Sequence, residues 1–232
     1  MHQNPDSVYN MSGRIGPGIV ARGLVMYLDA ANKSSYPSSG TTWYDLTTNN
    51  NSGSLVNGPT YDSTNGGSIV FDGTNDYVNI SKNSIFNLIT STTINVWRKH
   101  QNTEVMIAYD KSGWLGYSIN SNGVVYSGAS GLDDFYYSIS PAPTLNQWGM
   151  LTFIVDRENS LYKIYFNGEL NYSKSITQPA LSLTTPLYIG GRAGVGDMWY
   201  SGNISQISYY SRALSTTEIL QNYNALKCRF GL

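Results

Sequence analysis

The fold of this chain is decided by residues 66–80, GGSIVFDGTNDYVNI. Two short apolar runs in this stretch flank a tight polar turn between Asp72 and Asp76. Gly accepts positive φ angles, and the short side chains of Asp and Asn can hydrogen-bond the neighbouring backbone, so these residue types favour turns. The stretch therefore predicts a β-hairpin with the polar turn at its tip.

Strand-sized apolar runs separated by turn residues continue on both sides of this stretch. An opening strand is expected over residues 23–29. In residues 151–155 one alternating set is apolar and the other is Thr and Ile, so both faces of that strand are expected to be covered. Residues 161–166 lead into Asn167-Gly168, and Asn122-Gly123 repeats this pair, which accepts the φ angles of a type I′ hairpin turn. With no long helical pattern between these runs, the sequence predicts an all-β fold, an antiparallel β-sandwich.

One short helix is expected near the C-terminal end of the sequence. Ser215 and Glu218 have the spacing of a capping box, and Leu214 and Ile219 occupy the positions of a hydrophobic staple. An apolar face with helical spacing indicates that the helix lies against the sandwich. This face consists of Ile219, Tyr223 and Leu226.

The chain has 232 residues, which is enough for one large all-β domain with a core of its own. Residues 1–22 contain several Pro and Gly residues and no sustained periodicity, which predicts an N-terminal arm. An extended segment that packs on a partner and a disordered tail both fit this pattern. The sandwich domain is then expected over residues 23–232. Residues 1–6 lack the basic and apolar regions of a secretion signal, and no run approaches the ~20 apolar residues of a transmembrane helix.

The chain carries few charges: 12% of its residues are charged, with 14 Lys plus Arg against 15 Asp plus Glu. No basic stripe or basic amphipathic helix is present, so we expect neither a nucleic-acid partner nor membrane insertion. A net charge of −1 provides little repulsion between copies, which favours a homo-oligomer or a multi-copy lattice component. The one cysteine, Cys228, has no partner for an internal disulfide, and we expect it to be a small residue near a helix end.

The sequence resembles the laminin-G-like, concanavalin-A-like jelly-roll family from about Gly23 to Tyr223. The resemblance implies a β-sandwich jelly roll with a binding or structural role. It rests on short pieces in the family's order: GLVMYLD at 23–29, WYDL at 43–46, the stretch 66–80, WGMLTF at 148–153, YFNG at 165–168, LYIGGR at 187–192, GNISQI at 202–207 and YSRALS at 210–215.

Both ends of the domain resemble, more narrowly, laminin-G-like proteins of tailed bacteriophages. In such phages the domain is typically a virion component, in head decorations or tail fibres. The resemblance implies a non-enzymatic structural or accessory virion protein, made in the host cytoplasm without a signal peptide, whose partners are other virion proteins. The segments are LDAA at 28–31, Tyr36-Pro37, TWYDL at 42–46, ILQNYNA at 219–225 and RFGL at 229–232.

Residues for catalysis are missing from the expected places. In retaining glycoside hydrolases of this fold, the catalytic residues resemble a Glu-x-Asp-x-Glu motif on one strand, and the two Glu carboxylates face the sugar. No two of the four Glu residues come close enough to form that motif, and the adjacent Asp133-Asp134 would point to opposite faces of a strand. His2 and His100 have no spacing that suggests a triad, and the Cys and His count excludes a zinc site. We therefore expect no enzyme and assign no catalytic, cofactor-binding or metal residue. The four Glu residues are Glu104, Glu158, Glu169 and Glu218.

Calcium is the one metal whose binding the sequence leaves open, because many laminin-G-like domains bind it through Asp side chains and loop carbonyls. Asp72, Asn75 and Asp76 could offer oxygens from one turn, and calcium takes six to eight oxygen ligands. The alternative is that Asp72 and Asn75 form Asx-turns that shape the turn, and the sequence favours this alternative.

Aromatic residues in the expected rim loops are candidates for stacking on a pyranose, with neighbouring Asp and Asn as hydrogen-bonding groups. The alternative is packing at the sandwich edge or in a subunit contact, because 19 Tyr residues make some loop aromatics inevitable. The second function hypothesis is therefore a carbohydrate-binding adhesion module, such as a tail-fibre lectin domain, with a cell-surface glycan as partner. The candidates are Trp114 with Tyr117, Asp133-Asp134 with Tyr136-Tyr137, and Met198-Trp199-Tyr200.

Overall fold

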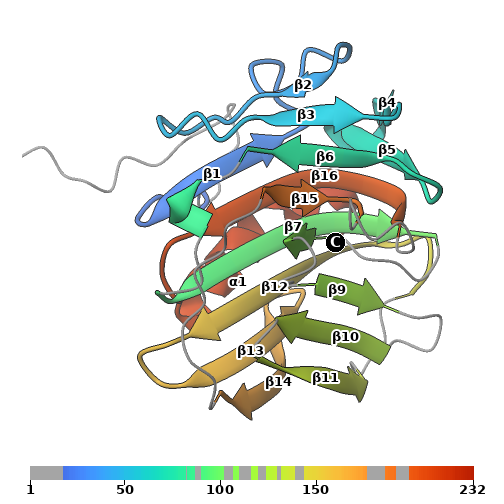
Figure 1. Ribbon diagram of the computed structural model, residues 1–232. Helices are drawn as coiled ribbons and strands as arrows, with labels where there is room; N and C mark the ends of the chain where they lie inside the picture. Colours follow the sequence, from blue (N-terminus) through green and yellow to red (C-terminus); the bar gives the residue numbers. More distant parts are fainter. Residues whose placement is uncertain are drawn as a thin grey trace, which may run out of the picture.

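The computed structural model shows a sandwich of antiparallel β-sheets with one short α-helix, so the predicted fold class is confirmed (Figure 1). It describes residues 18–81, 83–86, 90–101, 144–176, 186–191 and 199–232 in full. Of residues 102–143 it describes the backbone of the four strands β8 to β11.

Eight strands form the larger sheet, sheet A, in the order β14-β13-β12-β7-β16-β5-β4, with β1 also paired to β16. β16 pairs with β7 along one side, and with β5 and then β1 along the other. The strand nearest the C-terminal end therefore lies in the middle of the sheet. The strands of sheet A are β1 (Leu24–Asp29), β4 (Thr60–Asp62), β5 (Ser68–Asp72), β7 (Thr92–His100), β12 (Trp148–Asp156), β13 (Leu161–Phe166), β14 (Glu169–Ser175) and β16 (Ser201–Tyr210).

Five strands form the second layer, sheet B, in the order β2-β3-β6-β15-β8. A third sheet has the order β11-β10-β9. The strands of sheet B are β2 (Thr42–Trp43), β3 (Gly53–Val56), β6 (Tyr77–Ile80), β8 (Ile107–Tyr109) and β15 (Leu187–Ile189). Those of the third sheet are β9 (Gly116–Ile119), β10 (Val124–Ala129) and β11 (Leu132–Ser138).

Two hydrophobic clusters hold the layers together. The larger cluster lies between the sheets and contains Ile94 and Val96 of β7 together with Val78 and Ile80 of β6. The smaller cluster lies on the other side of sheet A, under the helix. As predicted for residues 151–155, β12 contributes to both clusters, because alternate residues of a strand point to opposite faces. Because buried apolar surface contributes roughly 25 cal/mol per Å², these two hydrophobic clusters are the main source of the stability of the fold.

The helix α1 (Thr216–Leu226) begins as the sequence predicts. Ser215 is its N-cap, its side chain accepts from the Glu218 backbone N–H, and the Glu218 carboxylate accepts from the Ser215 backbone N–H, so the capping box is confirmed. Leu214 and Ile219 are both buried in the smaller cluster. The helix therefore covers the outer face of sheet A; in Figure 1 it is seen behind β7 and β12.

Three short 3₁₀ helices complete the elements: η1 (Thr64–Gly66), η2 (Ser84–Phe86) and η3 (Lys227–Phe230). The last of them follows α1 directly and closes onto the end of β1. There the Arg229 guanidinium contacts both carboxylate oxygens of Asp29, at 2.9 and 3.1 Å.

The predicted hairpin at residues 66–80 is wrong. β5 pairs with β4 and β16 in sheet A, whereas β6 pairs with β3 and β15 in sheet B, so the turn connects the two layers. Apolar residues alternate in the same way in a hairpin and in such an arch, because in both cases they face one core. Which partner each strand takes is decided by segments far away in the sequence.

The Asn167-Gly168 turn is confirmed as a hairpin between β13 and β14. Asn167 has φ of 52° and Gly168 has φ of 87°, as a type I′ turn requires. The Asn167 side chain also accepts a hydrogen bond from the Met150 backbone N–H at 2.9 Å. The second predicted turn of this kind, Asn122-Gly123, lies outside the described residues.

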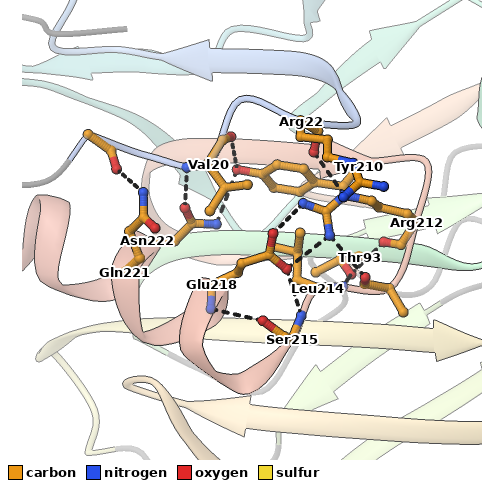
Figure 2. A network of polar contacts seen from close by, with 12 residues as sticks. Val20, Arg22, Thr93, Tyr210, Arg212, Leu214, Ser215, Glu218, Gln221 and Asn222 are labelled. Carbon is orange, nitrogen blue, oxygen red and sulfur yellow. Dashed lines mark hydrogen bonds and ion pairs between the residues drawn. The ribbon is translucent and has the colours of Figure 1, made fainter. Parts of the chain in front are cut away.

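Residues 18–22 pack along α1 through a buried polar network (Figure 2). The Val20 backbone N–H donates to Asn222 Oδ1 at 2.8 Å, and the Tyr210 hydroxyl donates to the Val20 carbonyl at 3.0 Å. Asn222 Nδ2 in turn donates to the Tyr210 hydroxyl oxygen at 3.1 Å. This end of the predicted arm is thus part of the packed domain, and residues 1–17 lie outside the described part of the chain.

Candidate functional site

The outer faces of the two sheets differ in what covers them. On sheet A the outward side chains lie under α1 and η3, and Trp97, Met150 and Ile154 have no exposed surface. On sheet B the corresponding outward residues keep exposed surface, as Ser54 and Tyr188 do. None of the described helices packs on this side, and β15 lies in front in Figure 1. The outer face of sheet B is therefore the one that can meet a ligand.

Three aromatic rings gather on this outer face. The ring centroids of Tyr77 and Trp199 lie 6.0 Å apart, with 33° between their planes. Tyr188 stands edge-on to Tyr77 at 5.8 Å and 80°. All three rings are half-buried, so each keeps part of its surface exposed. We call these residues, Tyr77, Tyr188 and Trp199, the aromatic cluster.

The strand alternation places the two tyrosines on the outside. Tyr77 precedes buried Val78 on β6, and Tyr188 lies between buried Leu187 and Ile189 on β15. Because successive side chains point to opposite faces, the tyrosines must point away from the core.

A glycine makes room for the third ring of the cluster. Gly191 pairs with Trp199 in an isolated bridge, and a Cβ added at Gly191 would lie 2.3 Å from Trp199 Cε3. That distance is far below van der Waals contact, so only glycine lets the indole ring lie this close to the backbone. Gly191 is therefore a positioning residue for Trp199.

A row of polar side chains runs beside the aromatic cluster across three strands. Thr42 of β2 pairs with Ser54 of β3, which pairs with Asn79 of β6, and Asn79 pairs with Tyr188 of β15. Residues in register across a sheet share one face, so these side chains all project outward. The outer face thus offers the hydroxyl groups of Thr42 and Ser54 near the aromatic rings, whereas the amide oxygen of Asn79 is buried.

Of the aromatic residues that the sequence suggests for sugar binding, Trp199 and Tyr200 lie in the described part of the chain, and they occupy different places. Trp199 belongs to the aromatic cluster. Tyr200 does not: it is 1% exposed, and its ring packs edge-on against Phe71 between the sheets. Burial raises the pKa of the Tyr200 hydroxyl well above its ordinary value. Trp114, Met198 and the side chains of Tyr117, Asp133, Asp134, Tyr136 and Tyr137 lie outside the described residues.

Sequence reasoning missed Tyr77 and Tyr188. The sequence carries a signal for Tyr77, because this residue follows the polar turn of residues 72–76 and alternates with the apolar residues Val78 and Ile80. Tyr188 showed the same alternation between Leu187 and Ile189. What the sequence did not show is that β6 and β15 are neighbours.

The turn considered for calcium already uses its carboxylates on the backbone. Asp72 Oδ1 accepts from the Thr74 N–H at 2.8 Å, as in an Asx-turn, and Asp76 Oδ2 accepts from the Asp72 N–H at 3.1 Å. Burial raises the pKa of Asp76, and the nearby Asp72 carboxylate adds to this. Within the described residues no group of three or more His, Cys, Asp or Glu side chains could hold a metal ion. The geometry thus fits the turn-shaping alternative for Asp72.

The Glu, His and Cys residues considered for catalysis or zinc binding lie on different elements where the structure describes them. Glu218 is engaged at the helix start, where Arg212 hydrogen-bonds both of its oxygens and lowers its pKa to about 2. His100 is buried, with Nδ1 at 2.8 Å from Arg98 Nη1, and burial together with the Arg98 charge lowers its pKa to about 3. Cys228 is exposed on η3. His2 and Glu104 lie outside the described residues.

None of the helices in the described part of the chain is long and apolar enough to cross a membrane.

Several solved structures share this architecture. Among solved structures, the binding domain of Paraclostridial Mosquitocidal Protein 1 aligns over 88% of this chain and 52% of its own, with 17% identity and a TM-score of 0.69. Domain 4 of AbnA, an extracellular arabinanase from Geobacillus stearothermophilus, in complex with arabinotriose, aligns over 86% and 98%, with 18% identity and a TM-score of 0.66. Trypanosoma rangeli sialidase in complex with sialic acid aligns over 97% and 36%, with 14% identity and a TM-score of 0.70.

These identities show a shared fold, and the chain spans about half the length of the toxin binding domains that it matches. The search among curated proteins returned no match. A family model does match at the sequence level, over residues 72–220. Because this match covers more than half of the chain, the chain belongs to the concanavalin A-like lectin/glucanases superfamily.

Proposed function

We propose that this chain is a non-enzymatic carbohydrate-binding domain that holds its glycan on the outer face of sheet B. The observation that carries this proposal is the aromatic cluster. It keeps exposed surface on one face of the sandwich, while the opposite face is closed by α1.

The chemistry of this face suits a sugar. A pyranose has an apolar face of C–H groups that packs on an aromatic ring, and hydroxyls around its edge that need hydrogen-bonding partners. Tyr and Trp provide rigid contact area with little loss of conformational entropy. In the polar row of Thr42, Ser54 and Asn79, the Thr42 and Ser54 hydroxyls provide donors and acceptors within the same sheet face.

The related structures support this proposal at the level of fold. The structure of the arabinanase domain contains arabinotriose. Another similar structure is from botulinum neurotoxin type C, whose cell entry depends on interaction with two ganglioside molecules. The sialidase shows that enzymes share the fold as well. Against hydrolysis in this chain stands the position of three of its glutamates: Glu158 lies in the turn between β12 and β13, Glu169 on β14 and Glu218 on α1, none of them in sheet B, which carries Tyr77 and Tyr188.

A glycan array tests the proposal. The wild-type domain is expected to give reproducible binding signals, and Trp199→Ala is expected to lose them while retaining the wild-type circular dichroism. Tyr223→Leu is the matched control, because Tyr223 is a half-buried aromatic residue on the helix-covered side. Absence of binding by the wild-type domain, or equal loss in both variants, would contradict the proposal.

A second proposed role is that of a virion component of a tailed phage, as a decoration or accessory protein. It is supported by the resemblance of both ends of the domain to phage proteins and by one feature of the structure. Residues 18–22 run along α1, on the side opposite to the aromatic cluster. An attachment through residues 1–17 would therefore leave the glycan face free to meet a cell surface.

Deletion of residues 1–17 tests this role, since it leaves the Val20 network intact. We expect the shortened protein to fold with an unchanged thermal midpoint and to be missing from purified particles. Unchanged incorporation into particles would contradict attachment through this segment. The copy number per particle would show whether the protein acts as one of many copies.

A further inference from the structure

The two rings of Tyr77 and Trp199 lie next to each other rather than edge to face. Their centroids are 6.0 Å apart and their planes differ by 33°. Tyr188 meets Tyr77 at 80°, so its plane stands across that of Tyr77 and does not extend the surface of the Tyr77 ring. The aromatic cluster thus consists of a two-ring platform, Tyr77 and Trp199, with Tyr188 as a wall beside it.

The platform runs across the strands of sheet B. Tyr77 is on β6, with Val56 of β3 as its partner in register, and Trp199 lies over Gly191, which follows β15. The two ring centroids are 6.0 Å apart, somewhat more than the ~4.8 Å between neighbouring strands of a sheet. Consecutive rings of an extended glycan chain repeat at a comparable spacing.

The polar row of Thr42, Ser54 and Asn79 lies beside the platform, and its register continues to Tyr188. Ser54, Asn79 and Tyr188 are partners in register across β3, β6 and β15, one row away from Val56 and Tyr77. A glycan chain lying on the platform would therefore have hydroxyl-bonding groups along its length, rather than at one point. A site for one terminal sugar would need these groups around a single ring.

On this basis we propose, resting on the proposed function, that the site takes two consecutive sugar rings of a glycan chain, which lies across the strands of sheet B. One ring stacks on Trp199 and the next on Tyr77. The ligand class is thus a chain with at least two contacted residues, and not a terminal monosaccharide.

Titration calorimetry with sugars of increasing length tests this inference. The probes are arabino-, laminari- and cello-oligosaccharides of one to four residues. For the series that binds, we expect the affinity to rise on the order of tenfold from one residue to two, because a second stacking contact forms. Further residues are expected to add less than about threefold, because the platform has only two rings.

Two variants separate this inference from the proposed function. In Tyr77→Leu and in Trp199→Leu only one ring remains, so the rise from one to two residues is expected to vanish while weak monosaccharide binding persists. Tyr223→Leu is expected to keep the rise. If the wild type binds monosaccharide as tightly as disaccharide, or if the rise survives in both variants, the two-ring site is wrong and the proposed function stands. If no sugar of any length binds here or on an array, the proposed function itself fails.

Discussion

Replacing Asn222 by Ala is expected to destabilise the domain by about 1–4 kcal/mol. Asn222 is 2% exposed on α1, and its amide joins the helix to residues 18–22 and to β16. The variant leaves the Val20 backbone N–H buried without its acceptor, which costs about 1–3 kcal/mol. It also removes the hydrogen bond to Tyr210, worth about 0.5–1.5 kcal/mol. The higher helix propensity of Ala returns less than about 0.7 kcal/mol.

Urea unfolding followed by tryptophan fluorescence measures this change. The midpoint is expected to fall while the dependence of the free energy on urea stays the same, since the surface exposed on unfolding is unchanged. Gln221→Ala is the matched control, because the neighbouring Gln221 side chain is only half-buried and makes one hydrogen bond, to the Gly18 carbonyl. We expect it to cost less than about 1 kcal/mol. A loss for Asn222→Ala below that of the control would refute the reasoning.

Three further predictions concern pH and the aromatic cluster. Glu218→Gln is expected to destabilise the domain by about 2 kcal/mol at pH 7, less than the full pKa shift implies because the pair with Arg212 is partly exposed. Since the folded pKa of Glu218 lies near 2, below its ordinary value, the difference in urea midpoint between wild type and variant should shrink as pH falls from about 4.5 towards 2; a difference that persists at pH 2 would contradict this. The His100 imidazole is expected to stay neutral at pH 5 in its NMR signals, because its pKa is about 3, and its protonation should favour unfolding as pH falls from 6.5 towards 3. Gly191→Ala is expected to displace the Trp199 ring and reduce glycan affinity about as much as Trp199→Ala, measured by calorimetry on a variant whose circular dichroism is unchanged; wild-type affinity would show that the close approach is dispensable.

Short-range signals in the sequence predicted local structure well. The capping box at Ser215 and Glu218 and the Asn167-Gly168 turn involve residues a few positions apart, so the chemistry that forms them is visible in one stretch. The turn at residues 72–76 was recognised, but its role was not. Pairing of β5 with β16 and of β6 with β15 depends on distant strands, which a local pattern does not reveal.

The same dependence on distant strands explains why only part of the aromatic cluster could be predicted from the sequence. Trp199 was noticed because it lies in an aromatic run, yet its neighbour Tyr200 was included although adjacent strand residues point to opposite sides. Tyr77 and Tyr188 meet only because β6 and β15 are neighbours in sheet B. Alternation predicted which way each side chain points, and only the assembled sheet showed which of them come together.

The central place of β16 in sheet A has a consequence for how the protein is made. β7 and β5 gain their shared neighbour only when residues 201–210 have left the ribosome, after most of the chain has been synthesised. Until then both strands present unpaired backbone edges, which are templates for association with other chains. Pairings between segments so distant in sequence also form slowly. The nascent domain therefore passes through a period in which it depends on chaperones or on dilution to escape aggregation, and high-level expression is expected to fail first at this stage, before the stability of the finished fold becomes limiting.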